Sequence, residues 1–350
     1  MGKILRLTGK YENTITGGHS YNASFFNKFS DLSGLEIVYL NPNFLEKYNG
    51  WKKVLAPILE LKLLNKIKHN DIVFMGDTAY MYHLILLMLI RLFKKTKTVV
   101  IIHHFPFLEK SSKDVSYYIQ KIYYSLCKYI IVPSPYTMKE AKQLYPKKQI
   151  TYIPIPFIQT YTPSNEYVKG NILYVGTIEH RKGLIYLIKA AKELVLQNVK
   201  FHIDIVGKVV NQSYYNNLQN YILENNLNEY VTFHGRVSEQ ELNNLYSCAE
   251  LFVLPSLLEG YGIVLVEAMQ RGLPIVAFDN SAMPFTVKND VNGYLAKNKD
   301  YKDLAYKIIQ LLGNESKRIK MQNNIKHEIN TLKTELDFID AIKDFFNMLN

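Results

Sequence analysis

The most chemically specific segment of the sequence places two glutamates eight positions apart around a glycine-rich turn. Glu259 directly precedes the turn at Gly260 and Gly262, and Glu267 follows it. A strand is predicted to lead into this turn, and a helix is predicted to begin near Ile263. Glycine lets a diphosphate approach the backbone closely. The start of a helix offers that diphosphate N–H donors and a positive dipole end.

The two carboxylates suit a ligand that carries many hydroxyl groups, because each carboxylate accepts several hydrogen bonds. Glu267 lies about one helical turn beyond Ile263, so it can reach hydroxyls of the ligand whose diphosphate meets the turn. The alternative is that both are surface glutamates at a helix N-terminus, where negative charge is favourable in any case.

A second charged cluster follows the strand predicted at 172–175. Gly176 and Thr177 begin a short loop, and Arg181 and Lys182 stand side by side where the next helix is predicted to start. One interpretation is that both are simply solvated side chains. This is the less favoured interpretation, because positive charge is electrostatically unfavourable at a helix start. A cationic clamp is more consistent with the position, because it would stabilise charge that builds on a departing diphosphate.

In the first half, two further features lie at predicted strand ends. Gly17 and Gly18 lie in the predicted loop after the strand at 4–7, and His103 directly follows the strand at 98–102. In open parallel sheets, ligands bind at the carboxyl ends of the strands. A turn that binds nothing and a structural histidine are the alternatives.

Short apolar runs alternate with longer amphipathic ones along the whole chain, the pattern typical of βαβ units. Strands are predicted at 4–7, 36–40, 71–75, 98–102, 129–132, 172–175, 202–206, 231–233, 251–254 and 275–277. Helices are predicted near 20–29, 54–68, 79–93, 117–126, 184–196, 214–224, 239–246 and 264–271, and again from Asp300 to the end.

Prolines and polar residues at 153–170 interrupt this pattern and predict a linker. We therefore expect an α/β fold of two Rossmann-like domains that face each other across a cleft, which would be the default binding site. The expected boundaries are 1–160 for the first domain, 161–330 for the second, and 331–350 for a C-terminal helix.

The segment from Pro255 to Met269 resembles the signature of the family 4 retaining glycosyltransferases, also called glycosyl transferases group 1, which have the GT-B fold. That signature reads P-S-x-x-E-G-x-G-x-x-x-x-E-A-M, and this chain matches each fixed position. The family also carries G-R-L-x-x-x-K-G after the first strand of its second domain, which Gly176 and Lys182 match. His234-Gly235, Gly207 and Asn292-Gly293 add supporting matches in the second half.

The resemblance implies a role for each candidate residue. Glu259 would contact the hydroxyls of the donor sugar, Glu267 the ribose, and the clamp of Arg181 and Lys182 the diphosphate. His103 would contact the transferred sugar. Catalysis would then depend on His103, Glu259, Arg181 and Lys182, with no metal. Donor binding would involve Gly17, Gly18, Gly176, Thr177, Arg181, Lys182, Glu259, Gly260, Tyr261, Gly262, Ile263 and Glu267.

The chain departs from the family pattern at two positions. Thr177 stands where the family has arginine, so Arg181 would have to serve in its place. Phe285 stands where the family usually has glutamate, which weakens any inference about the identity of the donor sugar.

The excess positive charge of the chain lies entirely in its first half. Residues 1–150 hold 22 Lys and Arg against 10 Asp and Glu, whereas residues 151–350 hold 20 against 21. Basic and apolar residues mix at 51–55, 61–68 and 91–97, as in segments that dock on anionic lipid. The alternative is that these lysines are the solvated faces of core helices. Nucleic acid is a less suitable partner because no recognition motif accompanies the charge.

No signal peptide or membrane-spanning segment is predicted, so we expect a cytoplasmic protein, with peripheral contact on the inner membrane face as an open alternative. The sequence thus predicts a retaining, metal-independent transferase that moves a hexose from a nucleotide-diphosphate sugar, with UDP-hexose as the guess, to a glycan, lipid-linked or protein acceptor. It predicts no cofactor. The alternatives are a non-catalytic nucleotide-sugar-binding scaffold and a GT-B epimerase or phosphorylase.

Overall fold

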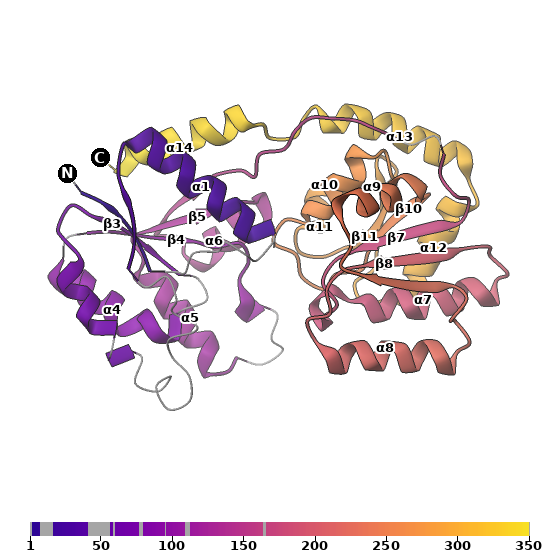
Figure 1. Cartoon of the computed structure of the whole chain (residues 1–350), viewed down its shortest axis with the longest axis horizontal. Coiled ribbons are helices and arrows are strands. Elements are labelled where there is room, and N and C mark those ends of the chain that lie inside the picture. The colour runs from indigo at the N-terminus through magenta and orange to yellow at the C-terminus, as the bar shows by residue number, and fades with distance from the viewer. Residues whose placement is uncertain are drawn as a thin grey trace. The chain divides into compact units, whose positions relative to one another are not determined.

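The structure is a computed structural model that describes residues 2–7, 17–40, 57–58, 60–76, 80–94, 96–108, 113–163 and 166–349. The chain forms two compact units. Unit 1 comprises Met1–Phe157 and Lys333–Asn350, and unit 2 comprises Ile158–Leu332. Each unit contains a six-stranded parallel sheet with helices on both faces (Figure 1). The predicted class of two Rossmann-like α/β domains is confirmed.

The sheet of unit 1 has its first strand near one edge. Its strands follow the order β2 (Ile37–Tyr39), β1 (Ile4–Arg6), β3 (Ile72–Met75), β4 (Lys97–Ile101), β5 (Tyr129–Val132) and β6 (Gln149–Tyr152). Apolar side chains from both faces of the inner strands are buried, as expected for a parallel sheet that helices cover on both sides.

Helices form a layer on each face of this sheet (Figure 1). One layer contains α1 (Gly17–Ser33) and α14 (Glu335–Leu349), which pack against each other. The other layer contains η1 (Glu60–Lys66), α4 (Tyr80–Phe93) and α5 (Val115–Leu126), and α4 packs against both neighbours. The described part of unit 1 also contains η2 (Pro106–Leu108) and α6 (Pro135–Leu144).

The alternation of side chains along β3 shows how one strand serves both layers. Phe74 contacts Phe25, Phe26 and Phe29 of α1 through ring pairs whose centroids lie 4.8 to 5.8 Å apart. The side chains on either side of Phe74 along the strand belong to the core beneath α4 and α5. Successive side chains of a strand point to opposite faces, so both layers are fixed to this strand.

The sheet of unit 2 repeats this architecture. Its strands follow the order β12 (Gly293–Ala296), β11 (Ile275–Phe278), β10 (Leu251–Leu254), β7 (Asn171–Val175), β8 (His202–Val206) and β9 (Val231–Gly235). The described helices of this unit are η3 (His180–Lys182), α7 (Leu184–Leu196), α8 (Gln212–Glu224), α9 (Glu239–Cys248), α10 (Ile263–Gln270), α11 (Met283–Thr286), α12 (Tyr301–Leu312) and α13 (Glu315–Ile329).

A buried ion pair ties α13 to this sheet. The Arg318 guanidinium lies 2.6 Å from the Glu250 carboxylate, which also accepts a hydrogen bond from the Gly170 backbone. A buried charge is costly unless it is paired, so this contact fixes α13 beside the start of β10.

The chain passes between the units twice, at Phe157–Ile158 and at Leu332–Lys333. The Phe157 N–H donates to the Lys333 carbonyl at 2.8 Å, and the Gln159 amide donates to the Leu332 carbonyl at 2.8 Å. The first crossing lies within the linker predicted at 153–170, of which residues 164 and 165 are outside the described part.

Most predicted elements lie within a few residues of the observed ones, and α7, β8 and β10 have the predicted bounds. The prediction lacked helix α6 and strands β6 and β12, and it also lacked the short helices η2, η3 and α11. Within the helix predicted near 54–68, residues 57–58 are α-helical and Glu60–Lys66 form the 3-10 helix η1, with Leu63 and Ile67 buried. Residues 54–56 and 59 lie outside the described part. None of the described helices is long and apolar enough to cross a membrane.

Candidate active site

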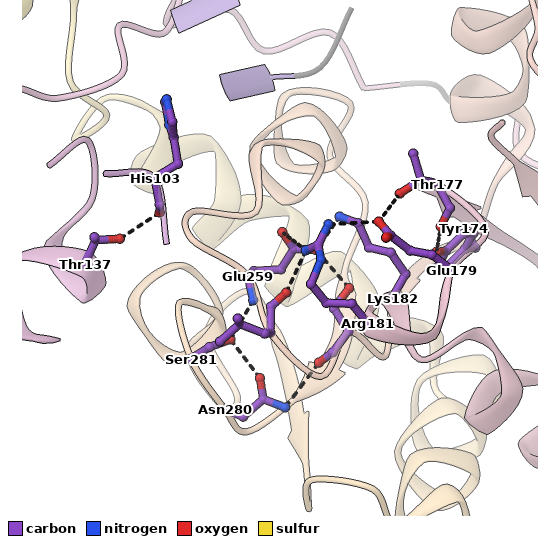
Figure 2. Close-up of polar contacts among 12 residues, drawn as sticks. His103, Thr137, Tyr174, Thr177, Glu179, Arg181, Lys182, Glu259, Asn280 and Ser281 are labelled. Carbon is purple, nitrogen blue, oxygen red and sulfur yellow. Dashed lines mark hydrogen bonds and ion pairs between the residues drawn. The ribbon is translucent and has the colours of Figure 1, made fainter. Parts of the chain in front are cut away.

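Glu259 lies at the centre of a polar cluster in unit 2 that contains both cations of the predicted clamp (Figure 2). Its carboxylate accepts hydrogen bonds from Lys182 Nζ at 2.5 Å and from Ser256 Oγ at 2.9 Å. Arg181 Nη1 lies 3.8 Å from its other oxygen. The cluster thus joins two cations to one carboxylate that is only 7% exposed.

The charges of this cluster stabilise the ionised carboxylate. Burial on its own would raise the pKa of Glu259, but the Lys182 and Arg181 cations outweigh burial and hold the pKa below its usual value. Glu259 is therefore an anion at neutral pH and keeps both cations close to it.

The backbone around Gly183 brings the cations to Glu259. Gly183 has φ 63°, and a Cβ at this position would lie 2.0 Å from the Pro255 carbonyl oxygen. The same two segments are also joined by a hydrogen bond of 2.8 Å, which the Leu257 N–H donates to the Arg181 carbonyl. Only glycine allows this close approach, which presses η3 against the loop that follows β10.

Glu179 orients the guanidinium of Arg181 from the side opposite Glu259 (Figure 2). Its Oε1 accepts from Arg181 Nη2 at 3.0 Å and from Thr177 Oγ1 at 2.7 Å. Arg181 Nη1 also donates to the Leu258 carbonyl at 2.9 Å. Thr177, which replaces the family arginine, therefore contacts Arg181 indirectly, through a glutamate that the sequence analysis did not select.

Gly176 lies where two loops meet closely. A Cβ on Gly207 would lie 1.9 Å from the Gly176 carbonyl oxygen, and one on Gly176 would lie 2.9 Å from the Tyr174 hydroxyl. The Gly176 N–H donates to the Val206 carbonyl at 2.9 Å. The close approach of the two loops therefore requires glycine at position 207, and the Tyr174 hydroxyl limits the space for a side chain at position 176.

The predicted helix start after the glutamate turn is confirmed. Helix α10 begins at Ile263, and Gly262 precedes it with φ 82°, a left-handed conformation that favours glycine. The N-cap residue is Gly262 itself, which has no side chain to cap the helix. Gly260 and Tyr261 lie half-buried in the turn between Glu259 and Gly262.

Glu267 is in the second turn of α10, where a buried tyrosine holds its carboxylate. Glu267 Oε2 accepts a hydrogen bond of 3.0 Å from the Tyr246 hydroxyl. Burial raises the pKa of Glu267 above its usual value, although the Tyr246 hydrogen bond and the Arg271 cation oppose the shift. Glu267 is thus fixed by Tyr246 of α9, and among the described contacts it has none with the cluster around Glu259.

A loop after β11 completes the surroundings of Glu259 (Figure 2). The Glu259 N–H donates to Ser281 Oγ at 3.0 Å, and Ser281 Oγ donates to Asn280 Oδ1 at 2.8 Å. Asn280 Nδ2 in turn donates to the Ser256 carbonyl at 3.1 Å. Ser281 has φ 44°, an uncommon conformation for a residue with a side chain, and it points its hydroxyl at the Glu259 backbone.

In unit 1, His103 packs against the glycine pair. His103 Nε2 lies 3.0 Å from Asn22 Oδ1 of α1, and the ring meets Tyr21 edge-on with centroids 5.4 Å apart. A Cβ on Gly18 would lie 3.4 Å from the His103 ring, so a small residue here leaves the imidazole room. Gly17 and Gly18 are the first residues of α1, although a loop was predicted there. Thr16 lies outside the described residues.

The environment of His103 favours a neutral imidazole. Burial, together with the neighbouring His104 and His19, lowers the pKa of His103 from 6.5 to about 3. Because Asn22 Oδ1 can only accept, the His103 proton lies on Nε2 and Nδ1 remains an acceptor. Thr137 also fixes the backbone here, since its hydroxyl donates to the His103 carbonyl at 3.0 Å (Figure 2).

The structure therefore places the predicted residues in two sets. The set in unit 2 joins Arg181, Lys182 and Glu259, and the set in unit 1 joins Gly18 and His103. The sequence analysis did not select the polar neighbours of these sets, which are Asn22, Thr137, Glu179, Ser256, Asn280 and Ser281. Ser256 was within the quoted motif, but the others have no local sequence signal.

Two α/β units, each with a six-stranded parallel sheet, are the architecture of the GT-B fold. Residues 164–328 match the model of the family described as glycosyl transferases group 1. This segment makes up most of unit 2 and somewhat less than half of the chain, and it is the part of the chain that is similar to that family.

Individual proteins extend the similarity beyond this segment. An uncharacterised glycosyltransferase of Methanocaldococcus jannaschii is 30% identical over 158 residues, 45% of this chain and 40% of that protein. O-antigen chain mannosyltransferase B of Escherichia coli is 27% identical over 71% of this chain and 68% of that protein. The chain thus spans about two fifths of the length of the first relative and about two thirds of the second.

The fold also matches solved structures. Anabaena HepE, solved in complex with UDP and glucose, has a TM-score of 0.73 and 16% identity, and the match covers 99% of this chain and all of that one. This likeness supports the GT-B fold.

Proposed function

We propose that the chain transfers a hexose from a nucleotide-diphosphate sugar to a glycan, lipid-linked or protein acceptor, with retention of anomeric configuration and without a metal. The observation that carries this proposal is the contact of Lys182 and Arg181 with the buried Glu259 carboxylate, directly before the N-terminus of α10. Retention rests on the resemblance to family 4.

The cation pair suits a diphosphate leaving group. An ammonium has three donors, and Glu259 takes one of those of Lys182, so others can bind phosphate oxygens. Negative charge on the diphosphate grows as the glycosidic bond breaks, and fixed cations in a partly buried site stabilise that charge. The backbone at Tyr261, Gly262 and Ile263 would add N–H donors at the start of α10.

The carboxylates then bind the rest of the donor. In the proposal, Glu259 accepts hydrogen bonds from hexose hydroxyls, and Glu267 accepts them from the ribose. Unit 1 would provide the neutral His103 as a hexose contact, the Gly17–Gly18 backbone for the diphosphate, and the acceptor site. UDP-hexose is the proposed donor class, and the HepE complex with UDP and glucose supports this choice.

A panel of nucleotide sugars tests the proposal and its alternatives together. Purified protein is incubated with each donor, with and without a membrane lipid or glycan extract, and released nucleoside diphosphate and free sugar are both measured. We expect nucleoside diphosphate from one donor, more of it with acceptor, and little in Lys182→Ala or Glu259→Ala.

Other outcomes would contradict the proposal. Free sugar or sugar phosphate formed at full rate without acceptor would indicate an epimerase or phosphorylase. Donor binding without any release would indicate a scaffold. Neither binding nor release for any donor would exclude a nucleotide-sugar site.

A further inference from the structure

The outer surface of helices α4 and α5 in unit 1 carries apolar side chains in two regular stripes. On α4, Met81, Ile85, Met88 and Leu92 are exposed at spacings that place them on one face of the helix. On α5, the exposed residues Val115, Tyr118 and Ile122 form a similar stripe. Leu92 and Val115 are each 73% exposed.

The two stripes share one layer of unit 1. Helices α4 and α5 pack against each other on the same face of the sheet (Figure 1). Arg91 of α4 donates to the Leu126 carbonyl of α5 at 2.7 Å, so the C-terminal ends of the helices lie together. Single exposed apolar residues are common, but two neighbouring stripes mark a surface that contacts something other than water.

Cations border this surface, and carboxylates are nearly absent from it. Neither α4 nor α5 contains Asp or Glu, and Asp114, which caps α5, is the one carboxylate among residues 80–94, 96–108 and 113–128. The basic residues on or directly beside these two helices are Arg91 and Lys94 at the end of α4, Lys113 just before α5, and Lys121 within α5. Exposed Lys62, Lys66 and Lys68 extend the basic border along η1, which packs against α4.

We propose that this apolar and basic surface of α4 and α5 docks on an anionic lipid bilayer. The apolar stripes would enter the boundary between head groups and acyl chains, and the lysine and arginine heads would meet anionic head groups. A long basic side chain can lay its stem along apolar surface while its charge reaches outward.

Charge complementarity favours lipid over a second copy of the chain. A symmetric dimer through this face would bring the same basic border of two subunits together, and like charges would repel. The sequence analysis expected lipid contact from segments at 51–55, 61–68 and 91–97. The first lies outside the described residues, and the structure instead adds α5, which the charge pattern alone did not indicate.

Vesicle binding tests the proposal with the full chain and without any donor or acceptor, so its outcome is independent of the proposed transfer. Sedimentation is measured with phosphatidylcholine vesicles and with mixed phosphatidylcholine and phosphatidylglycerol vesicles. The variants are Leu92→Glu on α4 and Ile122→Glu on α5. Leu223→Glu on α8 of unit 2 is the matched control, because Leu223 is also exposed on a helix.

We expect the wild type and Leu223→Glu to bind the anionic vesicles and to bind neutral vesicles more weakly. Each of the two test variants should bind anionic vesicles about tenfold more weakly or worse, because a charge then replaces an inserted apolar group. Binding should also weaken as salt is added. Circular dichroism and thermal midpoints confirm that each variant folds.

Three results would overturn the proposal. The wild type could fail to bind anionic vesicles, or Leu92→Glu and Ile122→Glu could bind them as the wild type does. The chain could instead form a dimer that Leu92→Glu dissolves, with no vesicle binding, which would assign the surface to a second copy.

Discussion

At the residue scale, the contact between Lys182 and Glu259 joins two candidate site residues that are 77 positions apart in the sequence. Their side chains are only 13% and 9% exposed. Removal of either partner leaves a largely buried charge without its nearest counterion, which is more costly than loss of a surface ion pair.

A double-mutant cycle should detect this coupling. Lys182→Met and Glu259→Gln should each lower the free energy of unfolding, and the double variant should lose about 1 to 3 kcal/mol less than the sum of the two. Urea unfolding measures all four proteins. The matched control is the exposed pair Lys3 and Glu36, whose cycle should give less than about 1 kcal/mol. Equal coupling in both cycles would contradict the burial argument.

His103 should make stability depend on pH in one direction. Its pKa is about 3 in the folded protein, against 6.5 for an ordinary histidine. Between these two pH values the unfolded chain binds more protons at this position, so stability falls as the pH is lowered. Above pH 6.5 both states are neutral there, and the contribution is complete.

Chemical unfolding of the wild type and His103→Gln at pH 8 and pH 5 measures this contribution. The difference at pH 8 gives the cost of the substitution itself. On going to pH 5, the variant should lose about 1 to 2 kcal/mol less stability than the wild type. An equal loss in both proteins would show that His103 takes up its proton as readily when folded as when unfolded.

At the scale of elements, the site depends on how closely the start of α7 approaches the loop after β10. Gly183 and Gly235 have nearly the same φ, 63° and 66°. A Cβ on Gly183 would strike the Pro255 carbonyl oxygen at 2.0 Å, whereas a Cβ on Gly235 would meet no atom within 4 Å. The two positions therefore separate the cost of the left-handed conformation from the cost of the close approach.

Gly235→Ala should destabilise the protein by about 1 to 2 kcal/mol, the cost of a left-handed alanine. Gly183→Ala should cost clearly more and should also reduce donor turnover, because the backbone must move and Lys182 moves with it. Thermal unfolding and nucleoside diphosphate release measure the two effects. Equal stability losses, with turnover intact, would mean that the loop absorbs the clash without disturbing the cluster.

At the scale of the whole molecule, the C-terminal helix completes the unit that contains the N-terminus. Phe338, Ile342 and Phe345 of α14 are buried, and Phe345 lies 6.0 Å from Phe29 of α1 between ring centroids. Along the sequence, unit 2 is thus inserted between two segments of unit 1, and both segments contribute to the core of unit 1.

Phe345→Ala should destabilise unit 1 by about 3 to 5 kcal/mol through the cavity that it leaves. Leu336→Ala on the same helix removes a side chain that is 72% exposed and should change stability by less than about 0.5 kcal/mol. Hydrogen exchange resolved by peptide can assign the loss to unit 1. A loss spread evenly over both units would contradict separate cores.

Much of this architecture could be predicted from the sequence, because buried parallel strands and amphipathic helices have distinct periods. The unpredicted elements carry weaker signals. Strand β6 is exposed or half-buried along its length, and β12 begins at a glycine. Helix α6 was missed although Ser134 followed by Pro135 is a recognised helix start, and Ser134 caps it.

Only those residues of the candidate site that lie within its sequence motifs could be predicted. Arg181, Lys182 and Glu259 lie in two recognisable segments, and the structure brings these segments together. Glu179, Asn280 and Asn22 contribute through tertiary contacts, and nothing in their immediate sequence distinguishes them from ordinary surface polar residues.

Donor binding by the cluster around Glu259 can be measured without an acceptor. Calorimetric titration of nucleotide sugars and nucleoside diphosphates into the wild type, Lys182→Ala and Lys192→Ala is the most direct test. Lys192 is an exposed lysine on α7 and serves as the matched control. We predict that the wild type and Lys192→Ala bind one donor equally, and that Lys182→Ala binds it about tenfold more weakly or worse. Equal binding by Lys182→Ala, or no binding by the wild type, would contradict a diphosphate site in this cluster.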